Sequence, residues 1–598
     1  MKKIYAAGVV LFLLVAVLAV LFLYAEPMGE APDFFAEPSP VFLPREGRPP
    51  APLGGPAGGF VLSVAPGVHD APFDLYIKYP SLPEVAIYFT IDGTAPAPGE
   101  SRYVERGGKT IQVAGRLPEC GTIHVADRTG YWRYALLAAH SESWRWYAMP
   151  EGDVLQGTSF RFGGFIRGEA ATAIKTATYI IAGDALSRFN HLPIIAVTAP
   201  YADFLYIYYH ADRRDITVRR REFNYEFFVP GTAGYEGAFS LPGSSSLGGW
   251  GSRAMPQRTI NVHLARGALD GVVEYPIFHG LDRLYRFRLH NGGNGFSWDF
   301  MRDAFAQRAS AGLNVLFSDN QLAVKFINGE FWGFTSMREH TSNRQFVSTR
   351  TGIAPRNIAI VDRAAATYRE GRADVVEEGD EALVLALYAE MTDFVRNHDM
   401  AGDYAAGRFF AEFFCEYNFM DYLIANTFFH NEDWPHNNVR LFRAVTPEEN
   451  NPYADGRWRF ILHDMDTAPA PGDSQYTQSR FAYLLALHPM VHEWELWLNY
   501  AFLVLNNPGF GQRFAQRARY VTARYFTPEV LLAQHAELYA QYGPLLPQMY
   551  ARFVLRETVA GSLARFYAYH AQLATFLTYR AQHYIVILDD LFPQGATR

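Results

Sequence analysis

The stretch DYLIANTFFHNEDWPHNNVRLFR, residues 421–443, joins a helical sequence to an extended one through a polar loop. The apolar spacing of AEFFCEYNFMDYLIANTFF (411–429) is that of a helix, and VRLFR (439–443) is typical of a strand. Asp433 and Asn438 stand five residues apart in the loop between them. An Asp that caps a loop and an Asn in a turn are often found five residues apart without any catalytic function. The pair alone therefore predicts no chemistry.

A second acidic stretch, WRFILHDMD (458–466), has the sequence of an apolar strand that ends in Asp464 and Asp466. Side chains two residues apart on a strand point to the same face, although a strand end can break that alignment. If both carboxylates and Asn438 face one cavity, their negative charge requires a divalent cation. A strand-end turn or a buried salt bridge is the alternative explanation.

The sequence around these stretches predicts an α+β chain with a helical C-terminal part. Residues 183–340 have β character, and Asn328-Gly329 is a strong hairpin signal between two apolar runs. The pattern turns helical from about residue 404 and stays helical from about 480 to 591. Thr527-Pro528 is a good helix start, with Thr as the N-cap and Pro as the first helical residue.

Residues 60–182 predict a separate domain. Short β-type runs alternate there with turn signals such as Asp92-Gly93, a spacing that favours a small antiparallel β-sandwich. Residues 26–59 contain 9 Pro and 6 Gly and are interpreted as an extended linker. The domain after the sandwich is then 183–598.

The N-terminus predicts a membrane anchor over residues 1–25. Residues 4–25 carry no charge, and at 1.5 Å per helical residue they span the roughly 30 Å hydrocarbon layer. The two lysines before this run predict that the N-terminus is inside and the rest of the chain outside the cell. We therefore expect a single-pass membrane protein with extracytoplasmic domains, or a secreted protein if the segment is cleaved.

Composition excludes several classes of protein. Lys+Arg number 53 and Asp+Glu 61, a net charge of −8, which argues against a nucleic-acid binder with a broadly basic face. Only two cysteines are present, Cys120 and Cys415, too few for a disulfide scaffold or a Cys-rich zinc module.

Two family resemblances add to these predictions. IYFTIDGTAPAPGESRY (87–103) with FRFGGFIRGEAATAIKTATYII (160–181) resembles the chitobiase C-terminal-like module, an accessory immunoglobulin-like sandwich without catalysis of its own. The rest of the chain, roughly 190–590, resembles the spore coat protein H (CotH) kinase family, an atypical branch of the protein-kinase-like fold. Besides the two acidic stretches, the matching segments are LPIIAVTAP (192–200), GGWGSRAMPQRTINV (248–262), FRLHNGGNG (287–295), MRDAFAQR (301–308), FINGEFWGFTSMRE (326–339) and NPGFGQRFAQRARYVTARYFTPEVL (507–531).

The CotH resemblance implies an atypical kinase that transfers phosphate from ATP, with Mg²⁺, to a protein Ser/Thr hydroxyl. By this resemblance Asp433 orients the hydroxyl, and Asn438 and Asp464 bind the metal, with Asp466 as second ligand or hydrogen-bond support. Arg258 steadies the phosphates, and Glu339, at the end of the hairpin, meets the nucleotide. The implied partners are a protein substrate or a surface protein.

The same resemblance has departures that leave alternatives open. Arg258 stands where the family usually has Lys, and the geometry of arginine differs from that of lysine. His463-Asp464-Met465-Asp466 also replaces the usual Pro-Trp-Asp-x-Asp. The chain is then alternatively a catalytically inactive kinase-like scaffold or binding module of the cell surface, whose sandwich contacts a glycan.

Two other enzyme classes are weaker alternatives. His430, His436, His463 and Asp464 are conceivable zinc ligands, although their spacing fits no standard helix motif. Asp433 and Asp464 are also a conceivable glycosidase pair, whose separation the sequence does not supply.

Overall fold

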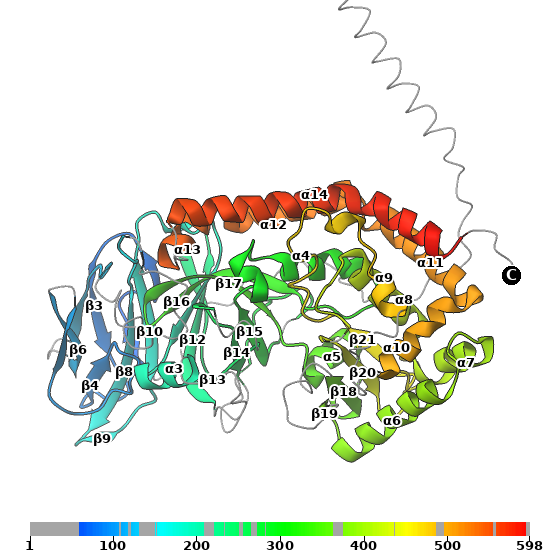
Figure 1. The fold of residues 1–598 in the computed structure, drawn as a ribbon. Coiled ribbons are helices and arrows are strands. Elements are labelled where there is room, and N and C mark those ends of the chain that lie inside the picture. The colour runs from blue at the N-terminus through cyan, green and yellow to red at the C-terminus, as the bar shows by residue number, and fades with distance from the viewer. Residues whose placement is uncertain are drawn as a thin grey trace, which may run out of the picture. The chain divides into compact units, whose positions relative to one another are not determined.

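The computed structural model describes most of residues 59–593 (Figure 1). The parts of that range left out are 107–108, 118–120, 131–149, 151, 209–219, 233, 250–254, 265–271, 282, 363–374, 436, 486–495 and 554–557. The predicted anchor (1–25), nearly all of the predicted linker (26–58) and Cys120 lie outside the described residues. Among the helices that are described, none is both long enough and apolar enough to cross a membrane.

Residues 61–181 form two β-sheets around a core of their own (Figure 1). One sheet has the order β1-β3-β7; the other runs β2-β10-β8-β4-β6-β5, with β9 beside β8. The strands are β1 (Val61–Leu62), β2 (Gly67–His69), β3 (Phe73–Lys78), β4 (Ala86–Thr90), β5 (Arg102–Arg106), β6 (Lys109–Arg116), β7 (Thr122–Val125), β8 (Thr158–Ile166), β9 (Glu169–Ala170) and β10 (Lys175–Ile181). In β3, Leu75 and Ile77 are buried while their neighbours are exposed, the alternation of a strand with one face in a core. This arrangement is compatible with the predicted sandwich.

The two-sheet region is bonded directly to the β-structure that follows. The Thr178 N–H and hydroxyl both donate to the buried carboxylate of Glu226, over 3.1 and 2.5 Å. Burial raises the pKa of Glu226. At Gly93, whose φ is +78°, a Cβ would lie 1.9 Å from the carbonyl oxygen of Ala199. Only a glycine allows this close approach between the two regions.

Seven strands then close into a barrel in the order β11-β12-β13-β14-β15-β17-β16 (Figure 1). They are β11 (Ile194–Thr198), β12 (Arg221–Pro230), β13 (Tyr235–Leu247), β14 (Ile260–His263), β15 (Arg286–His290), β16 (Asn320–Ile327) and β17 (Glu330–Glu339). The predicted hairpin at Asn328-Gly329 is confirmed, since both residues have positive φ, +48° and +80°, as a tight β16–β17 turn requires.

Besides the barrel, the region after the predicted sandwich has a second sheet of the order β19-β18-β20-β21. All strand pairs of this second sheet are antiparallel. Its strands are β18 (Ile358–Asp362), β19 (Val375–Glu378), β20 (Arg440–Ala444) and β21 (Arg459–Ile461). β20 and β21 pair directly, so the two chain segments that lead into β20 and out of β21 are brought together.

The other regular elements of the described residues are helices, joined by loops and short turns. They are α2 (Ala185–Arg188), α3 (Tyr201–Tyr208), α4 (Arg302–Ala309), α5 (Arg344–Thr351), α6 (Glu381–Asn397), α7 (Asp403–Arg408), α8 (Glu416–Phe428), α9 (Phe481–Leu485), α10 (Leu496–Phe502), α11 (Pro508–Arg524), α12 (Pro528–Tyr542), α13 (Leu546–Arg552) and α14 (Val559–Leu591). The sequence predicts the helical part from about residue 404, but α6 already begins at Glu381. Asp380 caps this helix by accepting from the Leu383 N–H. The predicted start of α12 is confirmed: Thr527 accepts from Val530 N–H.

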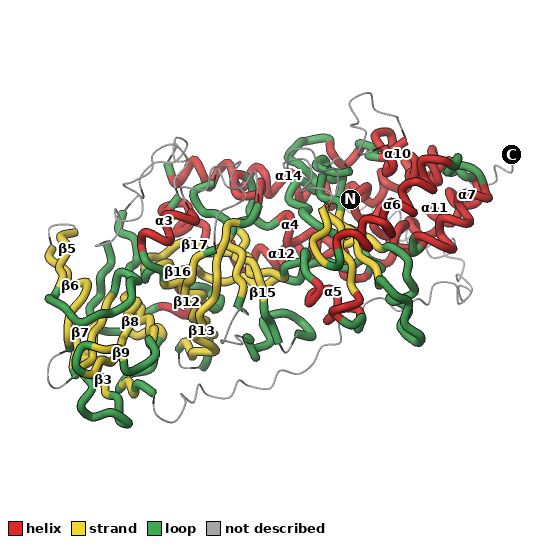
Figure 2. The backbone as a smooth tube through the Cα atoms, turned by 90° about the horizontal axis from the view of Figure 1, so that it is seen from below, coloured by secondary structure: helices red, strands yellow, loops and turns green. Residues whose placement is uncertain are grey.

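The long helix α14 packs along α12 (Figure 1), and Figure 2 shows that helices predominate toward the C-terminal end of the described residues and strands toward the other end. Its buried Arg580 donates to four carbonyl oxygens, of Thr427, Phe428, Tyr476 and Gln478, over 2.6–2.9 Å. Arg580 therefore holds the end of α8 in place, directly before the loop that carries Asp433.

Candidate functional site

The site lies where two loops meet, one leading from α8 to β20 and one leaving β21. The side chain of Asn431 joins them. Its Oδ1 accepts from the Thr467 hydroxyl over 2.9 Å and from Asp433 N–H over 3.3 Å. The Thr467 hydroxyl oxygen in turn accepts from the same N–H over 3.2 Å. Two stretches more than thirty residues apart in sequence are thereby held side by side.

Asp433 and Asn438, paired by their spacing in the sequence, are in contact. Asn438 Nδ2 donates to Asp433 Oδ2 over 3.0 Å, and Asn437 Nδ2 donates to Oδ1 over 2.9 Å. Asn438 has a φ of +63°, a conformation that Asn tolerates better than most residues. The loop lies between a helix and a strand, as the sequence predicted.

Asp464 and Asp466 lie beyond the end of the strand, because β21 stops at Ile461. Asp464 has a φ of +54°, and Met465 between the two carboxylates is fully buried. The Met465 N–H donates to Asp303 Oδ1 over 2.7 Å. The carboxylate of Asp466 accepts from the backbone N–H of Asn294 over 2.7 Å and from its side chain over 3.3 Å.

The three carboxylates act on one another electrostatically. The pKa of Asp464 is raised by burial and by the charge of Asp433, although arginine neighbours oppose the shift. Burial, and then the charge of Asp464, raise the pKa of Asp466 well above its usual range, and Asp433 adds to the effect. The acidic groups of the two stretches therefore lie close enough to influence one another, and their binding of one cation stays a prediction.

Arginines from other strands face these acids. In order of decreasing influence on Asp464 they are Arg338 on β17, Arg288 on β15 and Arg440 on β20. The sequence did not single out these three for the site. Each of them nevertheless lies in a segment that matches the family: Arg338 in FINGEFWGFTSMRE, Arg440 in VRLFR, and Arg288 in FRLHNGGNG, which also contains the Asn294 that binds Asp466.

Arg258, expected at the phosphates, is buried directly before β14. The residues on either side of it are held to one asparagine: Asn291 Nδ2 donates to the Gln257 carbonyl oxygen over 2.6 Å, and the Thr259 hydroxyl donates to Asn291 Oδ1 over 3.0 Å. The strongest cationic effects on Asp464 come from the three arginines above rather than from Arg258. Its role at the phosphates stays a prediction.

Glu339, expected to meet the nucleotide, has internal partners. Its carboxylate accepts from Arg350 over 2.7 and 3.2 Å and from the Asp319 N–H over 3.0 Å. Burial raises the pKa of Glu339, and Arg350 opposes that shift. These bonds give the carboxylate a structural function, and its contact with a nucleotide stays a prediction.

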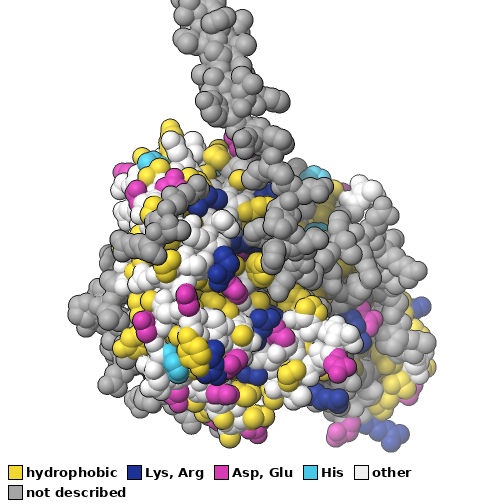
Figure 3. Space-filling view, turned by 90° about the vertical axis from the view of Figure 1, so that its right-hand side faces the viewer, with side chains coloured by type: hydrophobic (Ala, Val, Ile, Leu, Met, Phe, Trp, Pro, Cys, Tyr) yellow, Lys and Arg dark blue, Asp and Glu magenta, His cyan; other side chains and the backbone are white. Residues whose placement is uncertain are grey.

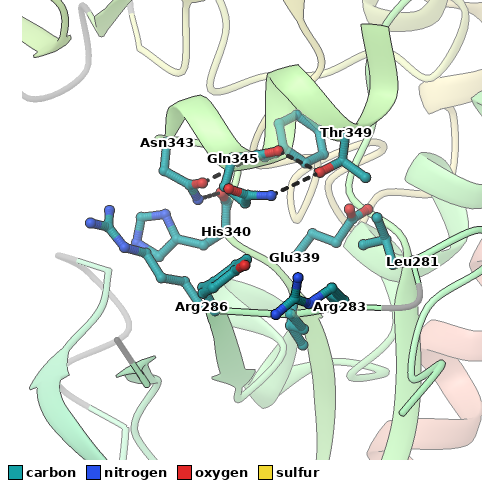
Figure 4. Close-up of a pocket in the computed structure, with 11 residues that line it drawn as sticks. Leu281, Arg283, Arg286, Glu339, His340, Asn343, Gln345 and Thr349 are labelled. Atoms are coloured by element: carbon teal, nitrogen blue, oxygen red, sulfur yellow. Dashed lines mark hydrogen bonds between the residues drawn. The ribbon is translucent and has the colours of Figure 1, made fainter. Parts of the chain in front are cut away.

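Glu339 also lines a small pocket between the end of β17 and α5 (Figure 4). Arg283, Arg286, His340 and Asn343 are among the other lining residues. The pocket holds about 280 Å³, including open solvent at its mouth. That volume is at or below the lower limit of usual small-molecule sites, so this pocket alone does not accommodate a nucleotide.

The side-chain oxygens of Asp464, Asp466 and Asn438 are ligands that Mg²⁺ accepts when substrate phosphates supply the rest of its coordination shell. Mg²⁺ is commonly bound through one or two carboxylates, with phosphate and water oxygens completing the shell. Asp464, with Asp466 and Asn438 nearby, supplies oxygen ligands of this kind. The described residues contain no cluster of three or more His, Cys, Asp or Glu arranged for a metal, and His436 lies outside them. The described residues thus lend no support to the zinc alternative, and Asp433, Asp464 and Asp466 do not form such a cluster either.

Comparison with protein families gives the class of protein that this site belongs to. Residues 249–584, more than half of the chain, match the family described as CotH kinase protein. The chain belongs to the CotH kinase family. The two-sheet region lies outside the matched residues, so its likeness to the chitobiase C-terminal-like module stays a prediction. The curated proteins contain no significant match to this chain.

Proposed function

We propose that this protein transfers the terminal phosphate of ATP to a serine or threonine hydroxyl of another protein. Asp433 orients the acceptor hydroxyl, and Asp464 with Asn438 binds Mg²⁺, supported by Asp466. The bound ion neutralises charge on the phosphates.

The transfer forms one bond and breaks one. The hydroxyl oxygen bonds to the γ-phosphorus while the bond from that phosphorus to the bridging oxygen of the β-phosphate breaks. The hydroxyl proton passes to the carboxylate of Asp433, and ADP leaves with the bonding electron pair. Asn437 and Asn438 keep that carboxylate oriented by donating to its two oxygens.

One observation carries this proposal: hydrogen bonds of Asn431 and Thr467 hold the loop of Asp433 and Asn438 beside the loop of Asp464 and Asp466. The charge of Asp433 accordingly adds to burial in raising the pKa of both Asp464 and Asp466. Like charges crowded in a buried place are unfavourable unless a cation or a proton compensates them.

Nucleotide binding by the purified full-length chain tests the proposal. We expect ATP to raise the melting temperature only when Mg²⁺ is present, and Asp464→Ala to abolish that effect. Asp433→Ala is expected to keep ATP binding and to lose phosphate transfer. Asp589→Ala is the control, because this exposed acid on α14 pairs with Arg519 at the surface, away from the site loops. An unchanged melting temperature with ATP and Mg²⁺ would contradict the proposal.

A non-catalytic binding module of the cell surface is the second candidate. Asp466 is already hydrogen-bonded to Asn294, and three arginines face Asp464, so part of the negative charge is balanced without a metal. This candidate predicts no response to ATP or Mg²⁺ in the same melting experiment.

The location and the partners are part of the proposal. Residues 4–25 are proposed to anchor the chain in the membrane with everything beyond them extracytoplasmic; the partner is a substrate or surface protein, and the sandwich contacts a glycan. On the face shown in Figure 3, basic and acidic side chains are interspersed among the described residues. Protease added to intact cells is expected to digest the region beyond residue 60; full protection would contradict this orientation.

A further inference from the structure

Three arginines lie on the strands next to the acidic loops. Arg288 and Arg338 are directly opposite each other on the paired strands β15 and β17. Arg440 comes from β20 of the other sheet, and its charge lowers the pKa of both. Like charges placed opposite each other on neighbouring strands are destabilising, so each guanidinium needs an anion.

Two of the three already have a carboxylate. Arg338 forms an ion pair with Asp303, whose other oxygen accepts from Met465 N–H. Arg440 is bonded to Asp362 and also donates to the Thr341 hydroxyl over 2.5 Å. These two arginines connect the barrel and the second sheet to the site loops.

Arg288 has no such carboxylate partner among the described residues. Its Nη2 contacts His340 Nε2 over 3.3 Å, and its buried Nε has no hydrogen-bond partner within the described part of the chain. Because a guanidinium only donates, His340 Nε2 must be the acceptor, which requires a neutral imidazole. Burial and the nearby charge of Arg288 lower the pKa of His340 well below its usual range, in agreement with that assignment.

The charge of Arg288 also reaches the proposed metal site. Arg338, directly opposite Arg288, is paired with Asp303, and Asp303 accepts from the Met465 N–H between Asp464 and Asp466. These contacts place Arg288 on the strand next to the loop that carries Asp464, in agreement with the effect of Asp464, which raises the pKa of Arg288 against the larger effect of burial. A metal on Asp464 and a guanidinium with an unused N–H donor together suit a chain of phosphate groups, since arginine binds phosphate oxygens in a planar, forked geometry.

We propose that Arg288, rather than Arg258, is the arginine that binds the phosphate chain of the nucleotide, with His340 holding its guanidinium toward Asp464. This inference rests on the proposed function and adds a residue to it.

Calorimetric titration of the full-length chain tests this role. Three ligands are compared in the presence of Mg²⁺: ATP, adenosine and inorganic tripolyphosphate. We expect Arg288→Gln to weaken ATP and tripolyphosphate binding about 10- to 100-fold, the range for losing a charge-assisted hydrogen bond, and to leave adenosine binding unchanged. Arg288→Lys is expected to recover part of the loss. Arg513→Gln, which removes an exposed arginine of α11 that pairs with Glu416, is the control and leaves all three affinities unchanged.

The outcomes separate the two proposals. If the unmodified chain binds ATP and Arg288→Gln binds it equally well, the role of Arg288 is overturned and the proposed function stands. If the chain binds tripolyphosphate through Arg288 but not ATP, the anion-binding role stands and the proposed function is overturned. Binding of neither ligand overturns both. Should Arg288→Gln fail to fold, Arg288→Lys decides: affinities for ATP and tripolyphosphate equal to those of the unmodified chain overturn the role.

Discussion

Asn438 donates a hydrogen bond to Asp433 over 3.0 Å, so two residues at kinase-loop spacing are in direct contact. Asn438 makes this contact with a positive φ of +63°, and its side chain also donates to the Asp433 carbonyl oxygen over 3.3 Å. The site that this pair belongs to leads to two predictions beyond the binding experiments above, and buried charges elsewhere in the fold lead to two more.

Replacing Asn438 separates its side-chain function from its backbone conformation. Asn438→Gly permits the positive φ, so we expect a melting temperature close to that of the unmodified chain. The metal ligand is lost, and the Mg²⁺ concentration needed for half-maximal phosphate transfer should rise at least about tenfold, as loss of one charged contact implies. Asn438→Ala should show the same loss together with about 1 kcal/mol of destabilisation, because alanine is strained at this φ. Unchanged Mg²⁺ dependence in Asn438→Gly would argue against a metal role.

A methyl group at Gly293 should disturb Asp466. Gly293 has a φ of +62°, and a Cβ there would lie 2.0 Å from Asp466 Oδ2. We expect Gly293→Ala to lower the free energy of unfolding in urea by roughly 2–4 kcal/mol, from backbone strain and the clash together. Gly168→Ala is the matched control, with a φ of +89° and no described atom within 4 Å of the added Cβ. It should cost only about 1–2 kcal/mol. Equal losses in the two variants would mean that the contact with Asp466 has no influence.

Lys325 on β16 should destabilise the fold in a pH-dependent way. Its ammonium is fully buried without a hydrogen-bond partner among the described residues, and burial lowers its pKa from 10.5 to about 7. The unfolded chain therefore binds more protons than the folded one between pH 7 and 10.5, and stability should increase as the pH rises through that window.

Lys325→Met tests this prediction by removing the titrating group. We expect the variant to be more stable at pH 7 by about 2 kcal/mol, the order of the cost of an unsatisfied buried polar group. The advantage should shrink by about 1 kcal/mol per pH unit above pH 7. Urea unfolding at pH 7 and pH 9 measures both effects, and parallel pH profiles for the two proteins would refute the assignment.

Two arginines on α11 should differ greatly in their effect on stability. Arg517 makes a bidentate ion pair with the fully buried Asp421, over 2.8 and 2.7 Å, and Asp421 also accepts from Asn314 N–H. Arg513, one turn earlier, pairs with Glu416 at the surface. Arg517→Met should cost about 3–5 kcal/mol, because it leaves a buried carboxylate unpaired. Arg513→Met should cost less than about 1 kcal/mol. Chemical denaturation of both variants tests the contrast; similar values would mean that Asp421 finds another partner.

Local sequence patterns were sufficient for several features. The helix, loop and strand around Asp433, the Asn328-Gly329 hairpin and the cap at Thr527 follow from spacing and turn chemistry over a few residues. Segment order along the chain likewise led to the family that residues 249–584 match. The end of the strand before Asp464 was placed too late, since Asp464 has a left-handed conformation and the buried Met465 separates the two acids.

Only the tertiary structure decided which charges meet. Arg288, Arg338 and Arg440 reach Asp464 because β15 pairs with β17 and because β20 carries the third arginine from the other sheet. The partner of Glu339 is Arg350, and the partner of Asp466 is Asn294. No local sequence pattern links the two residues of either pair. A local sequence pattern determines which way a chain turns over a few residues; the partner of a buried charge depends on strand pairing across the fold.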